Sequence, residues 1–259
     1  WREKGEEPIA LVRAKRRIDG ARVLSGWMES EESRRVLLRA RRVVHLAGTL
    51  NPADRDYEGA NLATTRRVAR AVAGRPGCRV VFLSYLGAAA ASANAYLATK
   101  GRAEDLLLET GAPVTIFRCS HIIGPPARPG PTASNLISRE GRAVPLLGNG
   151  RQRVAPVYLG DVVAAIEAAL EGGKSGIFDL QGPREMSLDE LVRILNRGRP
   201  VSVRHLPSFL TPLLGFLGPR LPRALIEVML RDSRADGSTA HREFDLAATP
   251  LEKIWTREQ

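Results

Sequence analysis

The sequence predicts an α/β fold, in which a doubly wound parallel sheet carries a smaller C-terminal lobe. Apolar, β-branched runs recur along the chain, with helix-favouring segments between them. Some runs, such as VVHLAG (43–48) and VVFLS (80–84), are continuously apolar, as strands buried on both faces of a sheet are. The chain has 259 residues and 44% apolar residues, which suffices for one large domain with a small annex.

The alternation of strands and helices sets the order of the elements. The expected strands are PIALVR (8–13), ARVLSG (21–26), RVVHLAG (42–48), RVVFLS (79–84), PVTIFR (113–118) and GIFDL (176–180). The expected helices lie near residues 30–39, 53–73, 95–110 and 160–171. Right-handed crossovers between such strands place helices on both faces of the sheet, which gives a Rossmann-like layer structure.

The regular alternation of strands and helices ends at the Pro/Gly loop GPPARPGP (124–131). Ser187 and Glu190 form a capping box ahead of a helix, and Thr249-Pro250-Leu251-Glu252 forms another near the end. Asp161 is interpreted as a helix N-cap rather than a catalytic acid. We therefore expect a nucleotide-binding type of domain over residues 1–124, rejoined by 156–182, and a smaller substrate lobe made of 125–155 and 183–259.

Charge and composition argue against several functions. The net charge of +11 is spread along the chain, only five of the 39 basic residues are lysines, and aromatic residues amount to 5%. This composition favours a generally basic surface over a nucleic-acid site, and it is compatible with phosphate-bearing ligands. Cys78 and Cys119 are too few for a disulfide framework, and the four histidines are scattered, so we expect no metal site.

Targeting and membrane signals are weak. No signal peptide opens the chain and no apolar run reaches the ~18 residues of a membrane span, so we expect a cytoplasmic protein. The most apolar segment, residues 206–230, is broken by Pro212, Pro219 and Pro222 and carries Arg220 and Arg223. It predicts short amphipathic helices, a lid or a surface for peripheral membrane contact.

AYLATK (95–100) places Tyr96 and Lys100 one helical turn apart. A phenol with an ordinary pKa near ~10 is a poor proton shuttle at neutral pH, and an adjacent ammonium lowers that pKa. The spacing alone is weak, because two polar residues on a solvated helix face give the same pattern.

Several stretches, in this order, resemble the extended or atypical short-chain dehydrogenase/reductase family, which includes NAD(P)-dependent epimerases and dehydratases. They are VVHLAGT (43–49), Asn61 on the following helix, VVFLSYLGA (80–88), AYLATK (95–100) and FRCSHIIGPP (117–126). The resemblance implies that Tyr96 is an acid/base, that Lys100 binds the nicotinamide ribose, and that Ser84 positions the substrate oxygen. It also implies cofactor contacts from Ala47, Gly48, Asn61, Cys119 and Ser120. Without that context, Ser84 is a strand-end cap and Tyr96 a half-buried aromatic residue.

Within that family, the separation of 12 residues between Ser84 and Tyr96 is similar to the atypical branch. The branch includes the nucleotide-binding accessory subunit of respiratory complex I and its bacterial relatives, some of which hold NADPH structurally. The resemblance therefore implies an NADP(H)-binding oxidoreductase or epimerase-like protein. The alternative is a non-catalytic redox sensor or accessory subunit, and a nucleic-acid-binding protein is the weakest possibility.

The residues at the end of the strand at 8–13 bear on the choice between NAD(H) and NADP(H). Dinucleotide-binding units that take NAD place an acidic residue there for the ribose 2′-hydroxyl. This chain has Arg13, Lys15 and Arg16, with no acid before Asp19. Guanidinium groups suit a 2′-phosphate, so the sequence predicts NADP(H) over NAD(H). A basic surface turn is the alternative.

The chain departs from the family pattern at three places. Trp27 stands where the family often has an adenine-binding Asp, and Cys119 stands where a proline is usual. The glycine-rich loop after the first strand is absent, and GNG (148–150) is no substitute. WREKGEEP (1–8) resembles the end of the first helix, so we expect a fragment that lacks roughly ~20 leading residues, the length of a strand, a turn and a helix start.

Overall fold

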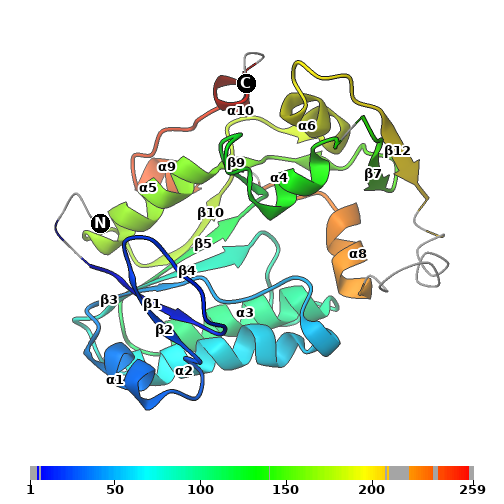
Figure 1. Cartoon of the computed structure of the whole chain (residues 1–259). Helices are drawn as coiled ribbons and strands as arrows, with labels where there is room; N and C mark the ends of the chain where they lie inside the picture. The colour runs from blue at the N-terminus through cyan, green and yellow to red at the C-terminus, as the bar shows by residue number, and fades with distance from the viewer. Residues whose placement is uncertain are drawn as a thin grey trace.

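The structure is a computed structural model that describes residue 5 and residues 7–139, 141–207, 209, 222–235 and 239–256. Strands and helices alternate as expected over the first 180 residues. Figure 1 shows a central sheet between helical layers, with a second group of shorter elements beyond the sheet.

The central sheet has four parallel strands in the order β10-β5-β4-β3. The strands are β3 (Arg42–His45), β4 (Arg79–Tyr85), β5 (Val114–Cys119) and β10 (Gly176–Leu180). β4, β5 and β10 lie within one residue of their expected positions, and β3 begins as expected but ends three residues early. Most residues of β4 and β5 are buried, which agrees with the apolar side chains at their centres.

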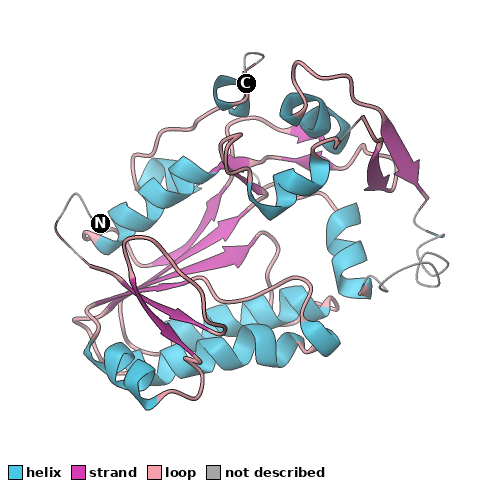
Figure 2. Cartoon of the chain, viewed as in Figure 1, coloured by secondary structure: helices cyan, strands magenta, loops and turns pink. Residues whose placement is uncertain are grey.

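Helices cover both faces of this sheet, as the secondary-structure view shows (Figure 2). α1 (Glu31–Arg39), α2 (Ala63–Val72) and α3 (Ala95–Leu108) pack on one face, and α5 (Leu159–Leu170) packs on the other. Side chains alternate between the two faces along β4: Val80 and Phe82 face the α1–α3 layer, while Val81 faces α5. The chain is therefore an α/β protein with parallel strands covered on both sides.

A separate parallel pair, β1 (Ile9–Val12) and β2 (Arg22–Ser25), lies beside the main sheet. Within the described residues, β1 pairs only with β2, and β3 pairs only with β4. Both β1 and β3 border one cavity of about 1130 Å³. We call this cavity the β1–β3 slot. Two strand edges that face it have no strand partner in the described chain.

A second core lies beyond the sheet. It is built by α4 (Gly130–Leu136), β7 (Val144–Leu147), β8 (Arg153–Val154), β11 (Met186–Ser187), α6 (Leu188–Leu195), β12 (Val203–Leu206) and α10 (Leu251–Ile254). Ser187 caps α6 by accepting from the Glu190 N–H at 3.2 Å, which confirms the expected capping signal. β6 (Ile122–Ile123), paired with β9 (Val157–Tyr158), links the two parts.

The expected N-cap at Asp161 is wrong. α5 begins two residues earlier, at Leu159, and Asp161 is buried in its first turn. Its carboxylate accepts from the Thr249 N–H at 2.8 Å and from the Thr249 hydroxyl at 2.7 Å. This contact also occupies the threonine that was expected to cap α10, whose N-cap is Pro250 without a side-chain hydrogen bond. The long-range contact between Asp161 and Thr249 thus takes the place of the two local helix caps that the sequence predicted.

The expected helix over 53–73 is interrupted. A 3₁₀ turn, η2 (Ala53–Arg55), precedes a π-helical turn, η3 (Glu58–Leu62), and α2 follows directly. Asp54 and Arg55 both have positive φ, which stops a regular helix from continuing through them. The π turn carries Asn61, and such turns often occur at functional sites.

The apolar segment 206–230 lies mostly outside the described residues; of it, residues 206, 207, 209 and 222–230 are described. They include α8 (Arg223–Leu230), which packs on α3, and α9 (Thr239–Glu243) follows it along the chain. Among the helices described, none is long and apolar enough to cross a membrane.

Candidate functional site

The candidate site lies at the carboxyl ends of β3, β4 and β5, beside α3. Asn94 starts α3 there, because its side chain accepts from the Leu97 N–H at 3.2 Å. The helix runs very close to the loop after β4: a Cβ on Gly101 would lie 2.3 Å from the Ala89 carbonyl carbon. This close approach brings Tyr96 and Lys100 to the end of β4.

Ser84, near the end of β4, is buried and donates its hydroxyl hydrogen bond to Glu104. Glu104 lies on α3 and is only 1% exposed. The Arg118 Nε, from β5, lies 3.1 Å from both carboxylate oxygens. The pairing with Glu104 raises the pKa of Arg118. Ser84, Glu104 and Arg118 thus form one charged, hydrogen-bonded network between β4, α3 and β5.

Lys100 is also buried, at 4% exposure. Its Nζ donates to the Leu83 carbonyl at 2.6 Å and lies 3.9 Å from the centre of the Phe82 ring. Burial lowers the pKa of Lys100 to about 7, although the Glu104 carboxylate and Cys119 act to raise it. A lysine with a pKa near neutrality is typical of a functional position.

Tyr96 is buried under α8, in a cluster with Tyr57, Leu97, Ala224 and Val228. Its ring meets the Tyr85 ring edge-on at 5.7 Å. Burial raises the pKa of Tyr96, and Tyr85 and Cys119 raise it further. The lowering by Lys100 that the spacing predicts is not among these effects, because the Lys100 Nζ is directed toward Leu83.

Asn61 holds the loop that follows β3. Its Oδ1 accepts from the Thr49 N–H at 2.8 Å, and its Nδ2 donates to the Thr49 carbonyl at 3.2 Å. Gly48 has φ of +144°, and a Cβ there would lie 2.7 Å from the Asn61 Oδ1 and 3.8 Å from the Lys100 Nζ. Glycine is therefore required where this loop meets Lys100.

Cys119 and Ser120 lie at the end of β5. Burial raises the pKa of the Cys119 thiol to about 12, which leaves it unreactive as a thiolate. The Ser120 hydroxyl donates to the Ser233 carbonyl at 3.2 Å. Ser233 also lies 3.3 Å, oxygen to oxygen, from the Tyr85 hydroxyl. The end of β5 is thus covered by the segment around Ser233.

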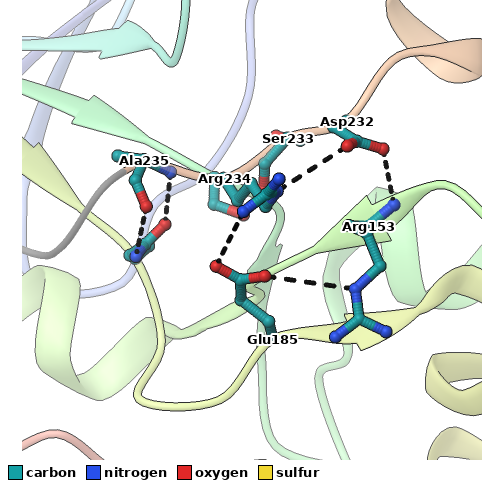
Figure 3. Close-up of polar contacts among 8 residues, drawn as sticks. Arg153, Glu185, Asp232, Ser233, Arg234 and Ala235 are labelled. Carbon is teal, nitrogen blue, oxygen red and sulfur yellow. Dashed lines mark hydrogen bonds and ion pairs between the residues drawn. The ribbon is translucent and has the colours of Figure 1, made fainter.

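That segment, residues 231–235, is tied down on both sides, as Figure 3 shows. The Ser233 N–H donates to the Arg153 carbonyl at 2.8 Å, and the Arg153 N–H donates to Asp232 at 2.7 Å. Arg234 forms ion pairs with Glu185 at 3.4 Å and with Asp232 at 3.6 Å. We call residues 231–235 the strap; it connects α8 to the carboxyl ends of β4 and β5.

The basic turn after β1 borders the β1–β3 slot rather than the buried group around Lys100. Arg13 and Arg16 line the β1–β3 slot together with Ala47, Gly48 and Thr49. Lys15 and Arg16 also border a smaller cavity of about 510 Å³. All three basic side chains are exposed, and Arg13 donates to the Gly59 carbonyl at 3.3 Å.

Trp27, one of the departures from the family pattern, is buried at 4% exposure in the core under α1 and also lines the slot. It occupies a packing position in this chain.

The residues singled out from the sequence therefore fall into two groups that meet at Gly48. Ser84, Tyr96, Lys100, Cys119 and Ser120 form a buried group, and Arg13, Lys15, Arg16 and Ala47 form an open one. Sequence reasoning missed Glu104, Arg118 and Ser233. Glu104 follows Lys100 by one more helical turn, a spacing that could have drawn attention to it. Ser233 carries no comparable signal.

This fold and this group of residues define a protein of the nucleotide-binding α/β class. A sequence profile of the NAD dependent epimerase/dehydratase family matches residues 1–180, and the chain belongs to that family. The resemblance found in the sequence is thereby confirmed.

Among curated proteins, the chain is similar to the mitochondrial NADH dehydrogenase [ubiquinone] 1 alpha subcomplex subunit 9 of Arabidopsis thaliana. The two are 30% identical over 172 residues, 64% of this chain and 42% of the relative. The chain therefore spans less than half the length of that relative.

Among solved structures, MoeE5 in complex with UDP-glucose and NAD has a TM-score of 0.75 at 21% identity, covering 98% of this chain and 89% of MoeE5. UDP-glucuronic acid 4-epimerase from Bacillus cereus in complex with NAD has a TM-score of 0.69 at 18% identity, covering 90% and 78%. At these identities the likeness shows the fold alone.

Proposed function

We propose that the chain takes part in binding NADP(H), with the nucleotide lying across the carboxyl ends of β1 and β3. One observation carries this proposal: Arg13 and Arg16 line the same cavity as Ala47 and Gly48. Gly48 allows a ligand to approach the backbone, and the guanidinium groups suit a phosphate. The structural neighbours solved with NAD support a dinucleotide in this position.

The strand order supports the same proposal. A doubly wound dinucleotide-binding sheet has the order 3-2-1-4-5-6, with the phosphates bound by the loop after its central strand. The order here, β2-β1, the slot, then β3-β4-β5-β10, leaves that central position empty among the described residues. A strand, a glycine-rich turn and a helix start would complete the phosphate site there. The elements around α6 would form the substrate lobe.

The chemistry that we propose is a carbonyl–alcohol interconversion of the oxidoreductase or epimerase type. A bound NADP(H) would supply hydride transfer. Lys100, whose Nζ is 3.8 Å from the Cβ position of Gly48, would bind the nicotinamide ribose. Tyr96 would hold or release the substrate proton at its hydroxyl. This role requires its pKa to fall from the raised value of the buried state, which a charged Lys100 turned toward the phenol would achieve.

A second candidate is a non-catalytic NADP(H)-binding sensor or accessory subunit. Two contacts favour it: the single Ser84 proton is donated to Glu104, and α8 covers Tyr96. Ser84 in this arrangement presents only an acceptor to a ligand. The similarity to a respiratory NADH dehydrogenase subunit supports the same candidate. In either case we place the protein in the cytoplasm, with the segment 206–230 as a surface for peripheral membrane contact.

Calorimetric titration with NADPH and NADH, carried out on the chain with a strand–glycine-rich turn–helix segment fused ahead of Trp1, tests the binding proposal, and we expect tighter binding of NADPH. Arg13→Ala combined with Arg16→Ala should remove most of that difference, because the 2′-phosphate loses its guanidinium partners. Arg70→Ala, on the exposed face of α2, is the matched control. An unchanged preference in the double variant would mean that the basic turn is only a surface feature.

A further inference from the structure

Two adjacent residues of β4 are bound by two residues of α3 that are one helical turn apart. Leu83 accepts through its carbonyl from Lys100, and Ser84 donates through its hydroxyl to Glu104. The spacing of four residues places Lys100 and Glu104 one above the other on the inner face of the helix. The whole arrangement is buried, with Lys100 at 4%, Ser84 at 6% and Glu104 at 1% exposure.

A buried carboxylate needs compensation, and Glu104 receives it from Arg118 on β5. The side chain of Arg118 is 27% exposed and that of Glu104 is 1% exposed. Because the guanidinium approaches both carboxylate oxygens, Glu104 and Arg118 form an ion pair in which the carboxylate has almost no exposure to water. A charge fixed in this way acts strongly on its neighbours, since the surroundings are apolar.

The groups around Lys100 come from three elements. β3 contributes His45, which stacks on Phe82 and whose pKa is lowered to about 3 by burial and by Lys100. β5 contributes Cys119, and α3 contributes Tyr96; burial raises the pKa of both, so both are neutral. Glu104 is thus the carboxylate that acts to raise the pKa of Lys100 within the described residues.

We propose that Glu104, paired with Arg118, is a positioning residue of this site: its carboxylate holds the Ser84 hydroxyl and favours the ammonium form of the neighbouring Lys100. The proposal rests on the proposed function in one respect, the role of Lys100 as the ribose ligand. Without Glu104, burial would lower the Lys100 pKa further, and the neutral amine that results would no longer favour a phenolate.

The test is the titration of Lys100 itself. The chain contains only five lysines, so lysine labelled with carbon-13 at Cε gives few resonances, and Lys100→Arg assigns the one of interest. We expect that resonance to titrate near neutral pH in the unaltered protein. Glu104→Gln should lower its pKa by about one unit or more, because a neutral amide no longer stabilises the ammonium. Glu109→Gln, an exposed carboxylate at the end of the same helix, should leave it unchanged.

Glu104→Gln leaves Arg118 without its carboxylate, so this variant could fail to fold. The double variant Glu104→Gln with Arg118→Gln removes both charges and keeps hydrogen-bonding groups at both positions. It should also lower the Lys100 pKa, because Glu104 is the group of the pair that acts on Lys100. A Lys100 titration that stays unchanged in either folded variant would overturn the proposal.

NADPH affinity measured against pH provides the second readout, and it separates this proposal from the proposed function. Affinity should decline as pH rises through the Lys100 pKa, and the decline should move to lower pH in Glu104→Gln. If no form binds NADPH while the Lys100 titration is still displaced, the proposed function is overturned and the action of Glu104 on Lys100 is supported.

Discussion

The two halves of the parallel sheet differ in how completely they are covered. At β4 and β5, helices close both faces, and each polar side chain of the site except the Tyr96 hydroxyl has a hydrogen-bond partner within the described residues. At β1 and β3, exposed apolar side chains line the slot: Ile9, Ile18, Val44, Leu46 and Val163. The half at β4 and β5 is a packed core. The half at β1 and β3 has the apolar side chains of a core, but these side chains are exposed at the slot.

This difference separates the two functional groups. Lys100 and Tyr96 belong to the closed half, where burial sets their pKa values. Arg13 and Arg16 belong to the open half, where solvent reaches them and no ligand geometry is imposed by the described chain. The residues proposed to handle the proton are therefore held in place by the described chain, whereas the proposed phosphate site depends on what occupies the slot.

The largest expected effect concerns the slot. The unpaired edges of β1 and β3 expose backbone hydrogen-bonding groups beside apolar side chains, which favours association between chains. We expect the 259 residues alone to aggregate or express poorly, and a strand–glycine-rich turn–helix segment fused ahead of Trp1 to yield a monodisperse protein. Light scattering and a thermal melt measure both. A monomeric, cooperatively melting product from the 259 residues alone would contradict this expectation.

The next effect tests the closed half as a catalytic site. Tyr96→Phe should reduce turnover by a factor of about 10² or more, the usual contribution of a general acid or base, and leave NADPH affinity nearly unchanged. Turnover is measured on the chain with the segment fused ahead of Trp1, with aldehydes, ketones and nucleotide sugars as substrates. Tyr57→Phe is the control, because its hydroxyl donates only to the Leu50 carbonyl, at 3.2 Å, in the same cluster.

An active Tyr96→Phe enzyme would remove the acid/base role from Tyr96. If no substrate is turned over by the unaltered protein while NADPH still binds, the non-catalytic candidate stands instead. Lys100→Ala should then weaken NADPH binding alone.

A smaller effect concerns the stability of the closed half against pH. The pKa of Lys100 is about 7 in the folded chain, whereas the ordinary pKa of a lysine is 10.5, so between these pH values the unfolded chain binds a proton that the folded chain does not. Stability should therefore rise as pH rises from about 7 to 10.5, by at most ~1.4 kcal/mol per pH unit from this group. Lys100→Met should flatten that rise, and Lys253→Met, exposed on α10, should not. Urea unfolding at several pH values measures the slope.

The sequence predicted the main sheet well because its signals are local. Continuous apolar runs located β4 and β5, and the serine at 187 located the start of α6. Asp161 was misinterpreted because its partner, Thr249, is 88 residues away in the sequence. The break between Ala53 and Leu62 was missed because the positive φ values of Asp54 and Arg55 occur at residues without a glycine signal.

For the site, the family pattern located Tyr96, Lys100 and Ser84 at one end of one strand and one helix. It did not reveal that the Ser84 proton is donated to Glu104, or that α8 lies over Tyr96. These contacts join β4, α3, β5 and α8, and depend on packing between elements that no local spacing encodes. The role of each residue in binding or catalysis stays a prediction.

The smallest effect compares the two halves directly, at neighbouring positions. Val44 of β3 and Val81 of β4 are partners in the strand register, and their exposures are 37% and 1%. Val81 packs against α5, whereas Val44 faces the slot. Val81→Ala should cost about 2 kcal/mol, since two buried methyl groups are lost and a void remains. Val44→Ala should change stability by less than about 0.5 kcal/mol, because more than a third of its surface is already in water and its loss at the open slot leaves no enclosed void. Urea unfolding of both variants measures the two costs.

The same two variants, measured in a chain with a strand segment fused ahead of Trp1, test the comparison further. If that segment fills the slot, Val44 becomes buried and the cost of Val44→Ala should rise toward that of Val81→Ala. Equal costs for the two variants in the unfused chain would mean that the slot is already closed in solution, and the division of the sheet into a covered and an open half would be wrong.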